Sequence, residues 1–309
     1  MTTLKNNTPI SPRLAKNIKR NIKERVIEFI LMLDALSAVL TTFSIVAVLV
    51  IESLAFFEHV SLIDFLTDTQ WTPLFEDAHY GIMPLVAGTL TTSAIALCVA
   101  IPLGTIGAIY LSEFASHKVR EIVKPVLELL VGVPTVVFGY FALLFVTPLL
   151  QKIYPDLPGF NMLAPGIVMG IMIIPYISSV AEDAMRAVPM SMREGSYAMG
   201  ATRFQTAVKV VTPAAISGII AAYILAISRA VGETMVVAIA AGQQPTLTFN
   251  PMESAATITA YIVQVALGDL PHGSIGYQSI FAAGLVLMIM TLTFNILGHF
   301  ARKRFRETY

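Results

Sequence analysis

The chain has 309 residues, of which 56% are hydrophobic and 13% charged, and its mean hydropathy is +0.74. These values exclude a soluble globular protein of ordinary composition and indicate a membrane protein. The formal net charge is zero, and we expect no nucleic-acid partner. Cys98 is the single cysteine, so neither a disulfide framework nor a cysteine metal site can form within one chain. We expect no metal and no cofactor.

The N-terminal tail, residues 1–28, is polar and carries seven Lys and Arg residues. The apolar run that follows is longer than a signal-peptide core and lacks a clear small-residue cleavage site. We therefore expect a basic cytoplasmic tail and an uncleaved first membrane span.

Six apolar segments are long enough to cross the hydrocarbon core, which takes about 20 helical residues. The sequence thus predicts an all-α membrane protein in which residues 29–309 form one domain of six transmembrane helices. The predicted spans are 29–51, 84–111, 125–150, 164–187, 214–242 and 279–300.

Lys and Arg residues are sorted between the segments that link these spans. The N-terminal tail, the second-to-third linker, the loop before the fifth span and the C-terminus hold 18 of the 20. The predicted outer loops hold only Lys152, and Arg229 lies inside an apolar run. Because cytoplasmic loops are enriched in Lys and Arg, both termini are predicted to be cytoplasmic.

Two long outer loops, 52–83 and 243–278, follow from this topology. The first carries six acidic residues and neither Lys nor Arg. The second contains the apolar stretch 256–268, which is too short to cross the membrane. We expect an interfacial or re-entrant helix there.

The cytoplasmic loop 188–213 is predicted to form two short helices. Ser191 followed by Glu194 fits a capping box after Pro189, and Gly200 suits the turn that ends the first helix. Such a surface hairpin can dock in a groove of another protein. The residues alone equally allow a packed hairpin with no partner.

This loop resembles the EAA loop of ABC importer permeases. Glu194 matches the glutamate of that motif, and Gly195 and Ser196 stand where it has two alanines. Gly200 and Pro213 match its glycine and proline, whereas Thr212 departs from its leucine. The resemblance implies that residues 190–200 form a coupling helix seated on a nucleotide-binding subunit. Since the chain has no phosphate-binding loop of the G-x-x-x-x-G-K-[ST] type, a separate polypeptide must supply the ATPase.

The fifth predicted span contains two charged residues, Arg229 and Glu233, four positions apart. On a continuous helix this spacing places them on one face, where they can pair. An unpaired charge at mid-bilayer costs at least about 2.5–3.5 kcal/mol, so such groups face a bundle interior or a watery path. Two interpretations remain open: a substrate site for an anion, or a structural pair that fixes helix packing.

The segment RAVGETM, residues 229–235, is similar to the R-A-x-G-E-T signature of phosphate ABC permeases and closest to their PstC-type subunit. Stretches within 65–73, 101–115, 132–143 and 267–277 resemble the same subunit. The resemblance implies a MetI-like permease fold with its core in 84–300. It also implies a substrate pathway for inorganic phosphate past Arg229, Gly232, Glu233 and Thr234.

The partners implied by the resemblance are a PstA-like permease subunit, two PstB-like ATP-binding subunits and a PstS-like phosphate-binding protein. The chain itself would be a transport subunit in the bacterial inner membrane, surrounded by lipid, and not an enzyme. The alternatives are a permease for phosphonate, sulfate or molybdate, a proton-coupled transporter with Glu233 as proton carrier, and a membrane sensor subunit.

Overall fold

The structure is a computed structural model that describes residues 12–73, 75, 77–268, 270–271 and 273–304, with side chains from Lys23 onward. Most of the predicted basic tail therefore lies outside the described side chains. The chain divides into two compact units, residues 1–51 and 52–309. The first unit holds most of one long helix, α1, which ends in the second unit.

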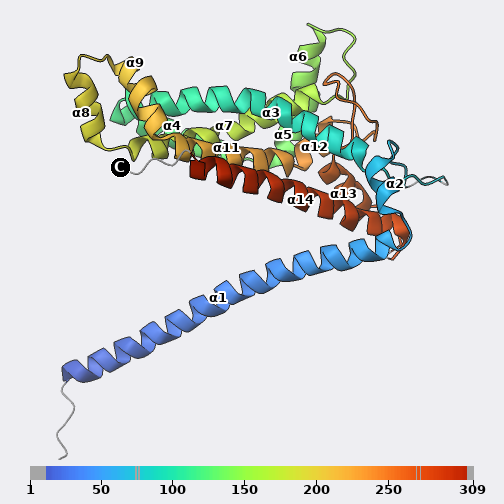
Figure 1. Cartoon of the computed structure of the whole chain (residues 1–309), viewed down its shortest axis with the longest axis horizontal. Helices are drawn as coiled ribbons and strands as arrows, with labels where there is room; N and C mark the ends of the chain where they lie inside the picture. Colours follow the sequence, from blue (N-terminus) through green and yellow to red (C-terminus); the bar gives the residue numbers. More distant parts are fainter. Residues whose placement is uncertain (1–11, 74, 76, 269, 272, 305–309) are drawn as a thin grey trace, which may run out of the picture. The chain divides into compact units, whose positions relative to one another are not determined.

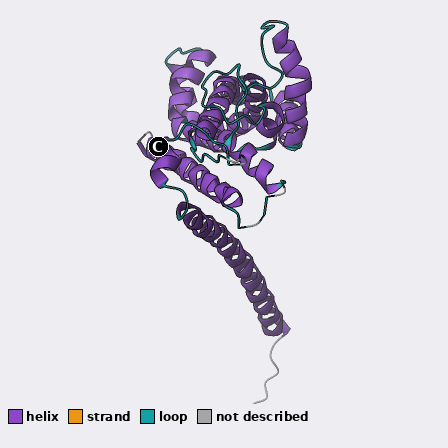
Figure 2. Ribbon diagram, turned by 90° about the vertical axis from the view of Figure 1, so that its right-hand side faces the viewer, coloured by secondary structure: helices purple, strands orange, loops and turns teal. Residues whose placement is uncertain are grey.

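The described residues are helical almost throughout, with two isolated β-bridges and no strand (Figure 2). Three of the segments, η1 to η3, are π-helical. The elements are α1 (Pro12–Phe57), α2 (Leu62–Thr67), α3 (Met83–Ile109), η1 (Tyr110–Phe114), α4 (His117–Val131), α5 (Thr135–Phe141), η2 (Ala142–Val146), α6 (Thr147–Gln151), α7 (Leu163–Arg186), α8 (Met190–Ala198), α9 (Arg203–Thr206), η3 (Ala207–Val211), α10 (Thr212–Ala214), α11 (Ile216–Val231), α12 (Met235–Ala240), α13 (Ile258–Ala266) and α14 (Ile275–Arg304).

Four helices in the described part of the chain are long and apolar enough to cross a membrane, and bent helix pairs raise this to as many as six. The unbroken four fall on the first, second, fourth and sixth predicted spans. The third predicted span is not one helix, because α4 and α5 meet at an angle of 87°. Pro134 occupies the N-cap of α5, and a proline disfavours helical backbone at the residue before it, so the helix cannot continue through this point.

Helices α3, α7, α11 and α14 pack side by side to form the bundle of the second unit (Figure 1). Close approach of α3 and α7 depends on glycine. A Cβ at Gly170 would lie 2.6 Å from the Cβ of Val99, and one at Gly104 would lie 2.7 Å from the Cβ of Ile177. Small residues of this kind let helices approach closely in membranes, where van der Waals packing drives association.

The two ends of this bundle carry different elements (Figure 1). Helices α8 and α9 lie at one end, whereas α2 and α13 lie at the other. Helix α13 falls within the predicted short apolar stretch, and most of its residues are buried. Near it, the first predicted outer loop folds around the buried Trp71, which bridges to Tyr80.

His79 pairs with two acidic residues of this loop: its Nδ1 lies 2.9 Å from Asp68 Oδ2, and its Nε2 lies 3.7 Å from Asp77 Oδ2. The hydrogen bond to His79 lowers the pKa of Asp68 below its ordinary value. The same bond raises the pKa of His79. The loop is therefore held by a contact that depends on pH.

Candidate functional site

The fifth predicted span is interrupted between its two charged residues. Helix α11 ends at Val231, Gly232 is its C-cap, and α12 begins at Met235. Arg229 thus lies in the last turn of α11, while Glu233 lies beyond its end. The expectation that the two share one helical face is wrong, and no ion pair among the described side chains joins them.

Arg229 is half-buried and stacks on an aromatic ring instead. Its guanidinium carbon lies 4.5 Å from the centre of the Tyr176 ring, and its buried Nε has no hydrogen-bond partner. A cation over an aromatic face is attracted by the quadrupole of the ring, but the ring does not cancel its charge. The result is a guanidinium with no carboxylate partner among the residues described.

Glu233 does not pair with Arg229 as predicted but hydrogen-bonds to neighbouring backbone and to α13. Its side chain is 8% exposed, and Oε1 accepts a hydrogen bond from the backbone N–H of Val236 at 3.5 Å, in the first turn of α12. The backbone carbonyl of Glu233 accepts a 2.7 Å hydrogen bond from Thr259 Oγ1 of α13. Glu233 therefore fixes the break between α11 and α12 and ties it to α13.

Gly232 and Thr234 complete the break. Gly232 is exposed, and Thr234 Oγ1 donates a 3.2 Å hydrogen bond to the carbonyl of Gly232. Discontinuous helices of this kind expose backbone groups, which membrane proteins tolerate where the backbone lines a cavity or is buried in protein. The structure brings the four predicted pathway residues to this break, with Arg229 supplying the only positive charge among them.

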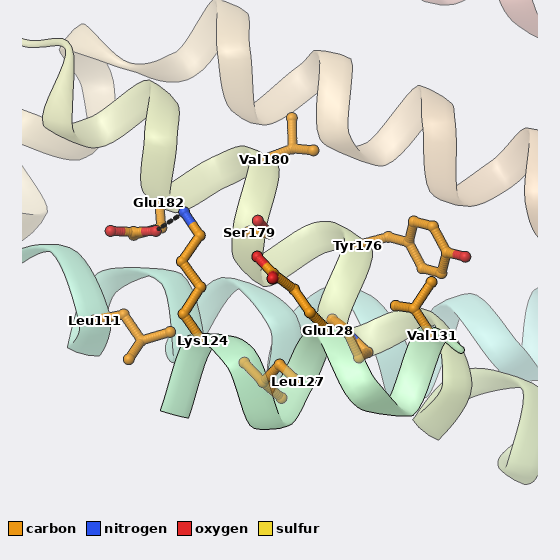
Figure 3. A pocket seen from close by; sticks show the side chains of 10 residues that line it. Leu111, Lys124, Leu127, Glu128, Val131, Tyr176, Ser179, Val180 and Glu182 are labelled. Carbon is orange, nitrogen blue, oxygen red and sulfur yellow. Dashed lines mark hydrogen bonds and ion pairs between the residues drawn. The ribbon is translucent and has the colours of Figure 1, made fainter. Parts of the chain in front are cut away.

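Tyr176 was missed by sequence reasoning, because it lies 53 positions before Arg229 and shares no motif with it. Its ring lines a cavity of 180 Å³ between α4 and α7. Figure 3 shows Glu128 and Tyr176 in its wall and Lys124 reaching Glu182. Lys124 Nζ lies 2.8 Å from Glu182 Oε2 and 2.8 Å from Asp183 Oδ1. The face of α7 that carries Tyr176 is thus also held by charge pairing to α4.

The predicted coupling loop forms α8 and α9, joined through Gly200 at φ +81°. This confirms the predicted turn, since glycine adopts positive φ at little cost. Ser191, Glu194 and Gly195 are exposed on α8. Ser196 Oγ lies 2.9 Å from Thr206 Oγ1, which joins the two helices. Pro213 lies in α10, just before α11.

The predicted capping box of Ser191 and Glu194 is wrong. Pro189 is the N-cap of α8, and no side chain caps that end. Proline can take this place because its extended backbone leads into the helix. A capping box does form in the loop, between Thr202 and Gln205 at the start of α9.

Arg193 anchors α8 to the transmembrane helices, a role that the sequence did not reveal. Its guanidinium donates to both carboxylate oxygens of Glu113 in η1, at 2.8 and 3.3 Å. It also donates to the carbonyls of Met185 and Val188 at the end of α7, at 2.9 and 2.7 Å. Both charged side chains are buried. One residue therefore joins η1, the end of α7 and α8.

Comparison with known proteins matches residues 100–307 to the family described as "Binding-protein-dependent transport system inner membrane component". A probable ABC transporter permease protein, YqgH of Bacillus subtilis, is 38% identical, with 79% of each chain covered. The phosphate transport system permease protein PstC 1 of Mycobacterium tuberculosis is 33% identical over 79% of this chain and 82% of its own. PstC of Haemophilus influenzae is 30% identical over 79% and 82%.

Solved structures share the fold at lower identity. A chain of a bacterial ABC transporter involved in the import of the acidic polysaccharide alginate superposes with a TM-score of 0.65 at 19% identity, over 96% of this chain and 100% of that one. The MetNI methionine ABC transporter gives a TM-score of 0.53 at 18% identity, over 74% of this chain and 95% of that one.

Proposed function

Because this chain belongs to the family of binding-protein-dependent transport system inner membrane components, we propose that it carries inorganic phosphate through the membrane as a PstC-type subunit. The chain is a multi-pass permease subunit of an ABC importer and not an enzyme. The relatives named as phosphate permeases support phosphate as the cargo.

The observation that carries this proposal is the Arg229 guanidinium at the break of α11, stacked on Tyr176 and lacking a carboxylate partner among the described residues. A planar guanidinium fork suits two phosphate oxygens better than a lysine point charge does. Since Glu233 accepts a hydrogen bond from the backbone of α12 and does not pair with Arg229, the guanidinium stays available to an anion. A single such contact holds the anion weakly enough for it to leave.

The proposed partners are a PstA-like permease subunit, two PstB-like ATP-binding subunits and a PstS-like phosphate-binding protein. Glu194 and Gly195 of α8 face solvent and would meet the ATP-binding subunit. Arg193 would pass movement of α8 to η1 and α7, because it is bonded to both. Movement of α7 would displace Tyr176 and hence the Arg229 guanidinium.

The test is uptake of labelled phosphate by cells that lack their own high-affinity system and express this chain with its partners. Arg229→Gln should abolish uptake while the protein reaches normal levels in the membrane. Glu194→Ala should also lose uptake, but it should leave phosphate-independent ATP hydrolysis by the isolated complex. Wild-type uptake by Arg229→Gln would show that Arg229 serves packing alone.

A further inference from the structure

A second cavity, of 390 Å³, lies where η1, α4, the end of α7, α8 and α9 converge. This basic cavity is separate from the break at Arg229. Its charged wall consists of Arg120, Arg186, Arg193, Arg203 and Glu113, and Tyr197 adds a hydroxyl. Topology predicted from the sequence places it on the cytoplasmic side.

The positive charges of this wall are not balanced within it. Glu113 is bound by Arg193. Arg186 Nη1 lies 3.5 Å from Glu182 Oε1, but Glu182 also forms an ion pair with Lys124, so one carboxylate is shared by two cations. The Arg203 guanidinium lies 5.5 Å from the centre of the Phe114 ring.

Arg120 and Arg203 take part in none of the ion pairs that the described residues form. Four guanidiniums therefore surround one cavity that holds a single carboxylate. Like charges gathered around a concave wall raise the local potential and attract an anion.

We propose that the basic cavity binds a phosphate-bearing anion. Guanidinium forks give paired, charge-assisted hydrogen bonds to phosphate oxygens, and several forks around one cavity can bind oxygens on different sides of a tetrahedral group. The same chemistry is offered by inorganic phosphate and by the headgroup of an anionic phospholipid. The cavity therefore binds either inorganic phosphate or the phosphate of a phospholipid headgroup.

Occupancy of the cavity changes the anchor of α8. Arg193 faces the anion and Glu113 at once, so a bound phosphate group competes with Glu113 for its donors. Weakening that bond loosens the connection from α8 to η1. The binding site does not depend on what the chain transports, whereas an effect on transport rests on the proposed role of α8.

The test measures inorganic phosphate binding by calorimetry, with the full-length chain in nanodiscs of neutral phosphatidylcholine at constant ionic strength. All variants carry Arg229→Gln, which removes the pathway arginine from the measurement. The pair Arg120→Gln and Arg203→Gln removes two arginines that have no ion pair. The matched control, Lys118→Gln with Lys303→Gln, removes the same charge from exposed positions outside the cavity. A second arm adds phosphatidylglycerol and measures the lipid retained by mass spectrometry.

Loss of the two arginines should weaken binding about tenfold or more, since a hydrogen bond to a charged group contributes about 1.5–3 kcal/mol. The control pair should bind like its parent. If no phosphate binds but phosphatidylglycerol is retained, and Arg120→Gln with Arg203→Gln abolishes that retention, the site exists and a lipid headgroup supplies its phosphate group. Binding of neither molecule, or equal loss in both pairs, overturns the proposal. Calorimetry on the chain in nanodiscs requires no transport, so failure of phosphate uptake in cells leaves this result unaffected.

Discussion

Replacing Arg193 by methionine tests how α8 is attached to the transmembrane helices. The change keeps much of the apolar stem but removes four hydrogen bonds, two to Glu113 and two to the carbonyls of Met185 and Val188. Glu113, only 6% exposed, would then keep a single side-chain partner, Ser112.

Breaking a buried ion pair by removing one partner costs about 3–5 kcal/mol, because the remaining charge stays desolvated. If the whole loss destabilises the packing of α8 against η1 and α7, local opening of α8 becomes about 100-fold to several thousand-fold more frequent. Replacing both partners with apolar groups avoids the unpaired charge, so Arg193→Met combined with Glu113→Leu should recover much of the loss.

Hydrogen exchange of the α8 amides, residues 190–198, in the chain reconstituted in lipid measures this opening. Exchange should accelerate strongly in Arg193→Met and in Glu113→Leu, less in the double variant, and remain unchanged in the bundle helix α3. Wild-type exchange in both single variants would refute the view that this pair holds α8.

Three further predictions concern packing, the pathway and the outer loop. Gly170→Ala places a Cβ 2.6 Å from the Cβ of Val99 and should lower the free energy of unfolding by about 1–3 kcal/mol, measured by thermal denaturation; Gly159→Ala, whose Cβ meets nothing within 4 Å, is its control. Tyr176→Leu should reduce phosphate uptake several-fold at normal membrane levels. Tyr176→Phe keeps the ring under Arg229 and should transport like wild type. Equal losses of uptake in the two variants would show that the ring does not position Arg229. The contact between Asp68 and His79 should stabilise the outer loop fully between the ordinary pKa of aspartate, 3.8, and that of histidine, 6.5; this stability is lost as pH rises through the raised pKa of His79 or falls through the lowered pKa of Asp68. Fluorescence of Trp71, the only tryptophan, should follow both steps and lose the upper one in His79→Gln.

Much of the fold follows from apolar run length, as four of the predicted spans show. The third and fifth spans did not, because run length alone cannot distinguish one straight helix from two helices that meet at a bend or break. The turn at Gly200 was predictable, since few residues other than glycine adopt positive φ without cost. The N-cap of α8 was not, because Pro189 begins that helix without any side-chain hydrogen bond.

The site was predictable in its residue types but not in its contacts. Charges inside an apolar run mark Arg229 and Glu233 regardless of geometry. Whether Arg229 and Glu233 share a helical face depends on where α11 ends, and one glycine, Gly232, is not enough to predict a helix end. Tyr176 and Arg193 act through residues far away in the sequence, so only the packing of α7 against α11 and of α8 against η1 reveals them.

We propose that this chain passes phosphate in a transporter driven by ATP. The most direct measurement is phosphate accumulation in vesicles that contain the complex of this chain with its partners, with ATP supplied to the ATP-binding subunits. A protonophore and an excess of sulfate are added in separate samples. Phosphate accumulation should require ATP, persist in both samples and disappear in Arg229→Gln. Accumulation abolished by the protonophore, or suppressed by sulfate as strongly as by unlabelled phosphate, would contradict it.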